Sequence, residues 1–327
     1  MHSKIDQPGS TESGDALSFM VARRQAGIRL DHFLVQVVPD ISRSVLSSSI
    51  RSGAIVVNTL AKKSSYRLRE NDRVTGHWLV ESAMHVEPEE MPLQILYEDE
   101  HLLVLSKPPG LVVHPGSGNH HGTLVNGLVF HCRNIAGVGD ALRPGIVHRL
   151  DKDTSGVMLV AKDERILRLL ADQFKNRRVD KEYIALLHGI MRERQGRIVA
   201  AIGRHSVNRQ KMAVREMTGR HAVTSWEVIG ELENRFSLVR LRIETGRTHQ
   251  IRVHMSHLGF PVAGDAVYGS HRQNQKFPRQ MLHASRLVFV HPITGRRLDI
   301  QAPLWPDLHQ ILNDLNGGLP IDIKECA

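Results

Sequence analysis

The sequence predicts an α+β fold, in which a small unit of helices and strands precedes a larger domain built mainly of strands. Three observations favour this. Strand-like apolar runs outnumber helical patterns beyond residue 93, an acidic stretch with two prolines separates the two parts, and the 41% apolar and 24% charged residues suit a globular chain. We therefore expect a flexible tail at 1–16, a compact unit at 17–80, a linker at 81–92, the sheet domain at 93–315 and a C-terminal tail at 316–327.

The charge balance points to nucleic acid. The 43 Lys and Arg residues exceed the 34 Asp and Glu residues by 9, an excess that favours a polyanionic partner. No apolar run approaches the ~18 residues of a membrane span, and the N-terminus lacks the apolar core of a signal peptide. Two cysteines without metal-ligand spacing argue against a disulfide framework or a zinc finger. We expect a cytoplasmic protein with no membrane partner.

The first unit reads as two helices followed by strands. Apolar residues recur at helical spacing in GIRLDHFLVQVV, which Pro39 ends, and SRSVLSSSIRSG is a second short helix that Gly53 closes. AIVVN then predicts a strand, and RLRENDRVTGHWLV predicts a turn and another strand.

This unit is also strongly basic. Residues 20–80 hold ten Lys or Arg residues against four acids. Such a run is often no more than a solvated face, but phosphate contacts dominate nucleic-acid affinity. We expect Arg43, Lys62 and Lys63 to contact the phosphates of a nucleic acid.

The larger domain alternates strands with a few helices. ERILRLLADQFKNR has the apolar spacing of an amphipathic helix, and a second helix begins within HQIR. Strands are expected within 93–108, 110–116, 146–147, 157–161, 182–189, 221–231, 235–246 and 286–292.

In one segment, several ionisable residues lie directly beside a predicted buried strand. In GIVHRLDKDTSGVMLVAKD, five ionisable residues fall within six positions beside buried-strand sequence: His148, Arg149, Asp151, Lys152 and Asp153. Charges at such a place must be paired, solvated in a cleft or used chemically. Asp153 fits a backbone-capping role, whereas Asp151 is a candidate nucleophile or general base.

A second polar segment, 244–269, supplies a partner for Asp151. Arg247 and Arg252 have no acid between them, so each needs an anion from elsewhere in the chain or from a ligand. A polar junction that bonds to itself is the plainer interpretation. If Asp151 lies in a cleft, Arg252 is suited to pair with it and keep it ionised.

Three further features allow two interpretations each. In SKPPGLVVHPG, Lys107 and His114 face a phosphate, or the segment is only a Pro-rich connection. Tyr183 fills the core, or it stacks on a base. The twenty histidines, with His249, His254 and His257 close together, suggest a metal-dependent hydrolase, but no HExxH or CxxC frame supports one, and we expect no bound metal.

Three motifs in one order identify a family. HRLDKDTSG, KEYIAL and GRTHQIRVH resemble the motifs of RluA-type pseudouridine synthases, particularly those of the large ribosomal subunit. YEDEHLLVLSKPPGLVVHPG, GDAVYG and LHASRL extend the resemblance from about residue 18 to 310. The first unit resembles the S4 RNA-binding domain through Arg29-Leu30-Asp31, Ser42-Arg43 and the segment 53–58.

The resemblance implies a fold and a reaction. The fold is a mixed, mainly antiparallel central sheet with flanking helices, preceded by a small α/β S4 domain. The reaction is the isomerisation of uridine in RNA: the glycosidic bond at N1 breaks and the base is re-attached through C5. No cofactor, metal or energy source is implied. The implied partner is large-subunit (23S) ribosomal RNA or a pre-ribosomal particle, and we expect a monomer.

The resemblance also assigns residues. Asp151 is the catalytic carboxylate, Tyr183 packs on the target base, Arg252 pairs with the carboxylate, and Arg149 fills the gap left by a flipped base. We expect the path of the RNA to be lined by His148, Lys152, Lys107 and Arg247. Residue identity leaves three routes open for Asp151, namely attack on C1′, addition to C6 or a glycal route. A non-catalytic RNA-binding assembly factor on the same fold is the alternative function.

Overall fold

The computed structural model describes two compact units, divided between His85 and Val86. The described residues are 13–39, 41, 43–79, 86–116, 119, 121–208, 211–270 and 276–319. Strand β1 (Ser13–Met20) begins inside the stretch predicted to be a tail, because it pairs with β3 (Arg73–Leu79) and buries Leu17. The remainder of that predicted tail, and residues 320–327 of the C-terminal one, lie outside the described residues.

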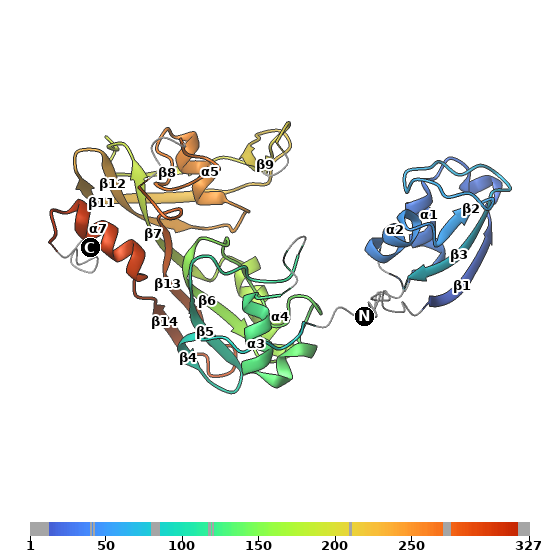
Figure 1. Cartoon of the computed structure of the whole chain (residues 1–327), viewed down its shortest axis with the longest axis horizontal. Helices are drawn as coiled ribbons and strands as arrows, with labels where there is room; N and C mark the ends of the chain where they lie inside the picture. Colours follow the sequence, from blue (N-terminus) through green and yellow to red (C-terminus); the bar gives the residue numbers. More distant parts are fainter. Residues whose placement is uncertain are drawn as a thin grey trace, which may run out of the picture. The chain divides into compact units, whose positions relative to one another are not determined.

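The first unit is a three-stranded antiparallel sheet packed against two helices (Figure 1). The sheet has the order β1-β3-β2, with β2 at Ile55–Val57, and the helices are α1 (Leu30–Val37) and α2 (Arg43–Arg51). Leu30, Phe33 and Leu34 of α1 lie on one helical face and are fully buried, as their spacing predicts. Both predicted helices and the predicted strands of this unit are confirmed.

The second unit is built on a nine-stranded, mainly antiparallel sheet. Its order is β4-β5-β6-β13-β7-β12-β11-β8, and β14 also pairs with β13. Only β6 and β13 run parallel among the described pairs. The strands are β4 (Gln94–Glu98), β5 (Leu102–Lys107), β6 (Ser155–Ala161), β7 (Asp180–His188), β8 (Gln195–Val199), β11 (Val223–Leu232), β12 (Phe236–Ile243), β13 (Leu282–Val290) and β14 (Arg297–Gln301).

Strand β7 lies inside this sheet and divides two hydrophobic clusters. Tyr183, Ala185 and Leu187 face the main cluster, and Ile184 and Leu186 alternate onto a second one. The main cluster is covered by α3 (Leu124–His131) and α4 (Glu164–Lys175), and the second by α7 (Pro306–Leu315). Helix α4 packs beside β6, and α5 (Gln250–His257) packs beside β11 (Figure 1). The predicted α+β class is therefore confirmed.

Several elements differ from the sequence prediction. Residues 110–116 form a loop, because prolines 108 and 109 and the left-handed Gly110 turn the chain there. Ile146 makes a single bridge to Val160 where a strand was expected. Sequence reasoning did not predict the helices α3 and α7 or the strands β8 and β14. It also did not predict the pair of three-residue strands β9 (Ile202–Arg204) and β10 (Met212–Val214).

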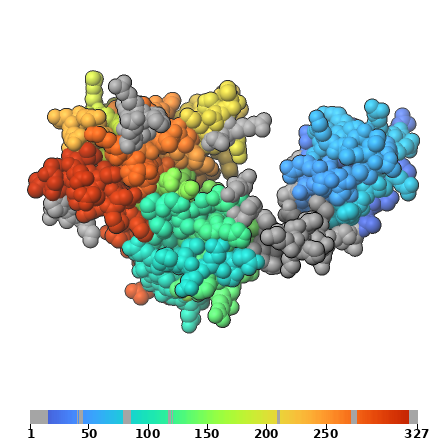
Figure 2. Space-filling view, viewed as in Figure 1, coloured from blue at the N-terminus to red at the C-terminus, as the bar shows by residue number. Residues whose placement is uncertain are grey.

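The segment that follows the division of the chain packs on the second unit. Val86 belongs to the main hydrophobic cluster, Asn126 donates a hydrogen bond to the carbonyl of Glu87, and the Glu89 carboxylate accepts from the backbone N–H of Gly122. The division falls within the stretch 81–92 that was predicted to be a linker. No helix in the described part of the chain is long and apolar enough to cross a membrane. Figure 2 shows the teal-to-green and yellow-to-red portions of the second unit meeting on the face in view.

Candidate active site

Asp151 lies in the turn that leads into the central strand β6. Its carbonyl accepts from the N–H of Thr154, and β6 begins one residue later. Gly156 sets how closely this segment approaches β13, since its φ is 115° and a Cβ there would come within 2.1 Å of the Ala284 carbonyl oxygen. Only glycine therefore allows the parallel contact of β6 with β13 that places Asp151 beside the middle of the sheet.

Arg252 of α5 bonds two carboxylates at once. Its Nη1 donates to Asp151 Oδ2 at 2.9 Å, while its Nε and Nη2 donate to Asp265 Oδ2 and Oδ1 at 2.6 and 2.9 Å. Asp265 is fully buried, and the side chains of Arg252 and Asp151 are 7% and 19% exposed. The forked pair with Asp265 fixes the plane of the guanidinium and aims its remaining nitrogen at Asp151.

The Asp265 carboxylate is itself held by the backbone. The N–H groups of Val267 and Tyr268 both donate to Oδ1. Burial acts to raise the pKa of Asp265, but the hydrogen bonds and charge of Arg252 outweigh burial and lower that pKa. The pKa of Arg252 is raised for the same reason, against the effect of its own burial. Both groups are therefore ionised, and Asp151 always faces a cation.

His249 stands on the other side of Asp151, at the start of α5. Its Nε2 lies 3.9 Å from Asp151 Oδ1, and its Nδ1 lies 2.8 Å from the hydroxyl of Tyr268. His249 has a φ of 57°, a left-handed conformation that residues other than glycine seldom adopt. Burial lowers the pKa of His249, and Arg252 and Arg149 act in the same direction against Asp151 and Asp265. The ring is consequently neutral at neutral pH.

Tyr183 provides an aromatic wall. It lies on β7 with 8% of its surface exposed, and burial together with the nearby charge of Asp151 raises the pKa of its hydroxyl. The hydroxyl is therefore protonated at neutral pH, and the ring offers a flat apolar face to whatever occupies the space beside Asp151.

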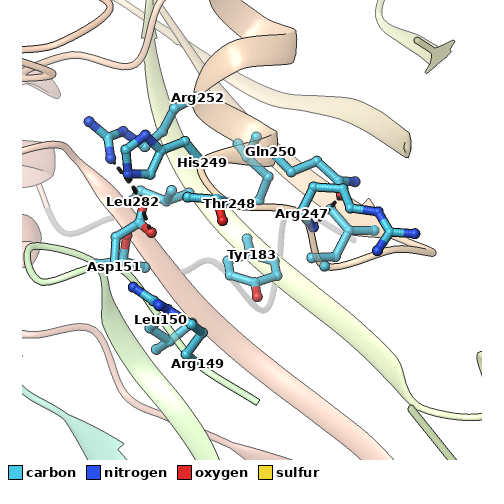
Figure 3. Close-up of a pocket in the computed structure, with 14 residues that line it drawn as sticks. Arg149, Leu150, Asp151, Tyr183, Arg247, Thr248, His249, Gln250, Arg252 and Leu282 are labelled. Atoms are coloured by element: carbon cyan, nitrogen blue, oxygen red, sulfur yellow. Dashed lines mark hydrogen bonds and ion pairs between the residues drawn. The ribbon is translucent and has the colours of Figure 1, made fainter. Parts of the chain in front are cut away.

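These residues enclose a small cavity of about 90 Å³ (Figure 3). Pockets for drug-sized ligands measure roughly 300–1,000 Å³, so this one suits a single ring rather than a large cofactor. Figure 3 shows Asp151, His249 and Arg252 gathered on one side, with Tyr183 facing them. The cavity is lined by Arg149, Leu150, Asp151, Thr154, Tyr183, Ile243, Gly246, Arg247, Thr248, His249, Gln250, Ile251, Arg252 and Leu282.

Gln250 fastens the loop that precedes α5. Its Oε1 accepts from the Thr245 hydroxyl and the Arg247 N–H, and its Nε2 donates to the Val223 carbonyl of β11. The rim of the cavity from 245 to 249 is thereby tied to the sheet.

The structure corrects one predicted RNA contact, Lys107, and gives another, His148, partners within the protein. Lys107 is fully buried, and its ammonium donates to the carbonyls of Pro108, Leu111 and Lys152 at 2.7, 2.9 and 2.9 Å. Burial also lowers the pKa of Lys107 to about 7. His148 stacks on Phe174 and accepts the N–H of Leu159. The Lys107 ammonium is therefore committed to the protein interior and is not placed to line an RNA path, whereas the His148 ring is half-buried.

The other predicted contacts differ in exposure, and Arg247 and Lys62 are half-buried. Arg149 and Lys152 are exposed, and Arg149 and Arg247 line the cavity. In the first unit, Lys63 is exposed and Lys62 lies over the ring of Tyr66 at 5.3 Å. Arg43 begins α2, and its side chain lies outside the described residues.

The three histidines considered as metal ligands point apart. His254 is buried, with its ring nitrogens on the Thr224 hydroxyl and the Ala200 carbonyl, while His257 is exposed at the end of α5. Elsewhere, Glu98, His131 and Cys132 have ligand atoms within 4.8 Å of one another, but the ammonium of Lys162 already binds Glu98 at 2.6 Å.

Sequence reasoning missed two members of the site, Asp265 and Tyr268. The signal was present, because two arginines without an acid between them implied an anion elsewhere in the chain. GDAVYG contains both missed residues. Because the GDAVYG segment lies far from Asp151 in the sequence, sequence reasoning did not predict that Arg252 would bind both Asp151 and Asp265.

A protein-family comparison gives a clear match. The sequence profile of the family described as RNA pseudouridylate synthase matches residues 101–257. That segment contains Asp151, Tyr183, His249 and Arg252, but it ends before Asp265.

Curated relatives extend the match over almost the whole chain. The chain is 42% identical to the ribosomal large subunit pseudouridine synthase D of Zymomonas mobilis, over 88% of this chain and 94% of that protein. It is 41% identical to the protein of the same name from Xanthomonas campestris, over 95% and 96%. Among solved structures, human RNA pseudouridylate synthase domain containing 1 is 29% identical, with a TM-score of 0.53 over 72% of this chain and 100% of that one.

Proposed function

The chain belongs to the RNA pseudouridylate synthase family and is an isomerase of uridine in RNA; on that premise we propose that it modifies specific uridines of large-subunit ribosomal RNA, with Asp151 as its catalytic carboxylate. The family and the fold predicted from three sequence motifs are confirmed. The proposed RNA target draws on relatives that are named for the large ribosomal subunit and match nearly end to end.

The arrangement around Asp151 is the observation that carries the proposal. One carboxylate oxygen is bound by Arg252, and Asp151 borders the cavity with Tyr183 facing it (Figure 3). Arg252 places a positive charge beside the carboxylate, and the strands around it restrict water. A charged oxygen on a rigid segment, next to a space the size of one ring, suits attack on a nucleoside whose base has entered that space.

A base inside an RNA helix cannot reach this cavity, so the uridine must leave its stack. Unstacking costs a few kcal/mol, which packing of the base against Tyr183 offsets. Arg149, exposed at the mouth of the cavity, occupies the gap that the flipped base leaves. Arg247 and Lys152 contact the neighbouring phosphates, since Arg247 is a half-buried cation that lines the cavity and Lys152 is an exposed cation next to Asp151.

The small N-terminal unit adds affinity for RNA without taking part in the chemistry. Its basic residues, Arg43, Lys62 and Lys63 among them, supply phosphate contacts of the kind made by S4 domains. The protein works as a cytoplasmic monomer without a cofactor.

The test is an isomerisation assay on defined RNAs. Transcripts of large-subunit rRNA, small-subunit rRNA and tRNA, tritiated at C5 of uridine, are incubated with wild-type protein and with Asp151→Asn. We expect tritium release only from large-subunit rRNA and only with the wild type, while the two proteins bind that RNA equally well. Release by Asp151→Asn contradicts the catalytic assignment. RNA binding by the wild type without release favours the alternative, a non-catalytic assembly factor.

A further inference from the structure

His249 has a structural setting that pairing with Asp151 alone does not require. It lines the same cavity as Asp151 and Tyr183, and it takes a left-handed backbone conformation that costs a non-glycine residue about 1–3 kcal/mol. Strain of this kind persists where the surrounding structure fixes a side chain in one place. Here the Nδ1 atom of the ring lies 2.8 Å from the Tyr268 hydroxyl, and the two rings meet edge to face.

From this geometry we propose that His249 is a catalytic residue, the base that removes the C5 proton of the target uracil and returns a proton to N1. This inference rests on the proposed function of Asp151. It concerns a step that is common to attack on C1′, addition to C6 and the glycal route.

The two ring nitrogens have different partners. The hydroxyl oxygen of Tyr268 lies 2.8 Å from His249 Nδ1 and also accepts the N–H of Met212 at 2.8 Å. In the tautomer with its proton on Nδ1, His249 donates to Tyr268, and Nε2 keeps a free lone pair. Nε2 lies 3.9 Å from Asp151 Oδ1, too far for a hydrogen bond, so this lone pair is not engaged by the carboxylate.

The reaction requires one proton to change place. When C1′ leaves N1 and bonds to C5, C5 carries both the sugar and its original hydrogen. In the proposed step, the C5–H bond breaks, its electron pair restores the ring of the uracil, and the proton bonds to Nε2 of His249. The resulting imidazolium then gives a proton to N1, so the product gains one hydrogen at N1 for the one lost at C5, and His249 returns to its neutral form.

The groups around His249 suit both halves of this step. Arg252 and Arg149 favour the neutral ring that accepts the proton, whereas Asp151 and Asp265 favour the imidazolium that forms. Tyr268 holds Nδ1 and keeps its own ring beneath the Arg252 guanidinium, 5.1 Å away. Tyr268 is thus a positioning residue for His249.

The experiment measures the chemical step in single turnover with the full chain and large-subunit rRNA. The variants are His249→Gly, which also relieves the left-handed strain, and His249→Asn, which tolerates that conformation. His257→Asn is the matched control, because His257 is an exposed histidine on the same helix. We expect rate constants about 10²–10³-fold lower for both His249 variants, unchanged RNA affinity, and an unchanged rate for His257→Asn.

Two further readouts separate a proton carrier from a structural residue. Deuterium at C5 should slow His249→Gly by a primary isotope effect, and added imidazole should restore part of its rate in proportion to the neutral fraction of imidazole. A His249→Gly rate within threefold of wild type overturns the proposal. So does a loss that comes with weakened RNA binding and shows neither imidazole rescue nor an isotope effect.

Asp151→Asn in the same assay keeps the two claims apart. If Asp151→Asn is inactive and His249→Gly is normal, the proposed function stands and His249 is not the base. If Asp151→Asn turns over, the assignment of Asp151 fails whatever His249 does.

Discussion

Arg252 and Asp265 form a buried ion pair with two hydrogen bonds, which leaves one guanidinium nitrogen for Asp151. The two hydrogen bonds to Asp265 fix the orientation of the Arg252 guanidinium without any contribution from Asp151. The Asp151 carboxylate therefore meets a cation whose orientation Asp265 already fixes.

Replacing Asp265 tests this arrangement. Asp265→Asn removes one charge of a fully buried pair, so we expect about 3–5 kcal/mol lower free energy of unfolding and a lower kcat, with RNA affinity retained. Urea unfolding and single-turnover kinetics measure both. Asp299→Asn is the control, because the pair of Asp299 with Arg286 is about one-third exposed and should contribute about 1 kcal/mol or less. Equal effects of the two variants would contradict this account.

The ring of Tyr183, rather than its hydroxyl, should matter. Tyr183→Phe keeps the flat face and should retain most of the activity, whereas Tyr183→Leu should weaken productive binding by about 1–3 kcal/mol, the value of one base stacked on an aromatic ring. The measurement is kcat/KM for isomerisation of a large-subunit rRNA fragment. Should the phenylalanine variant lose as much as the leucine variant, the hydroxyl has a chemical role that this account does not give it.

Lys107 should stabilise the fold through its three backbone carbonyls. Lys107→Met leaves the acceptors of Pro108, Leu111 and Lys152 without their donor, which we expect to cost about 2–4 kcal/mol in unfolding free energy. Lys152→Met removes the same charge from an exposed neighbour and should change stability by about 0.5 kcal/mol or less. The measurement is the melting temperature of both variants in thermal unfolding. Similar melting temperatures would show that the three bonds contribute little.

His283 should make the larger unit sensitive to acid. Its Nε2 donates to the Ala302 carbonyl and its Nδ1 accepts from the Ser155 hydroxyl, an arrangement that only the neutral ring can make. Burial lowers the pKa of His283 to about 4 from 6.5, so the unfolded chain binds the additional proton between these values. The stabilisation is present above pH 6.5 and is lost as the pH falls toward 4.

By linkage, His283 alone should cost the protein about 2 kcal/mol of stability between pH 8 and pH 5. The check is urea unfolding at a series of pH values, for wild type and for His283→Gln, which does not titrate. The variant should be less stable at pH 8 and should lose less on acidification. Parallel curves for the two proteins would assign the acid sensitivity to other groups.

Sequence patterns predicted most of the fold because the apolar spacing is local. Helices α1, α2 and α4 and the strands around Tyr183 follow directly from it. The strands β9 and β10 have three residues each, which is too short to show an alternation of apolar and polar residues. Helix α3 packs its apolar residues almost all the way round, and such a segment shows no clear stripe.

Part of the site, the pair of Asp151 and Arg252, was predicted from the pairing of charges rather than from apolar spacing. The pairing of Asp151 with Arg252 follows from the need of each charge for a partner, and the structure places them 2.9 Å apart. The error at Lys107 has the opposite origin. A lysine in a Pro-rich loop is usually exposed, and no local pattern indicates that three carbonyls from two loops converge on it.

The central claim is that Asp151 converts uridines of large-subunit rRNA. The most direct measurement is a map of pseudouridines in that rRNA, by carbodiimide adducts and primer extension, from cells with the wild-type protein and from cells with only Asp151→Asn. The account predicts stops at specific uridines in the first RNA and their loss from the second. An identical map from both cells would contradict the claim.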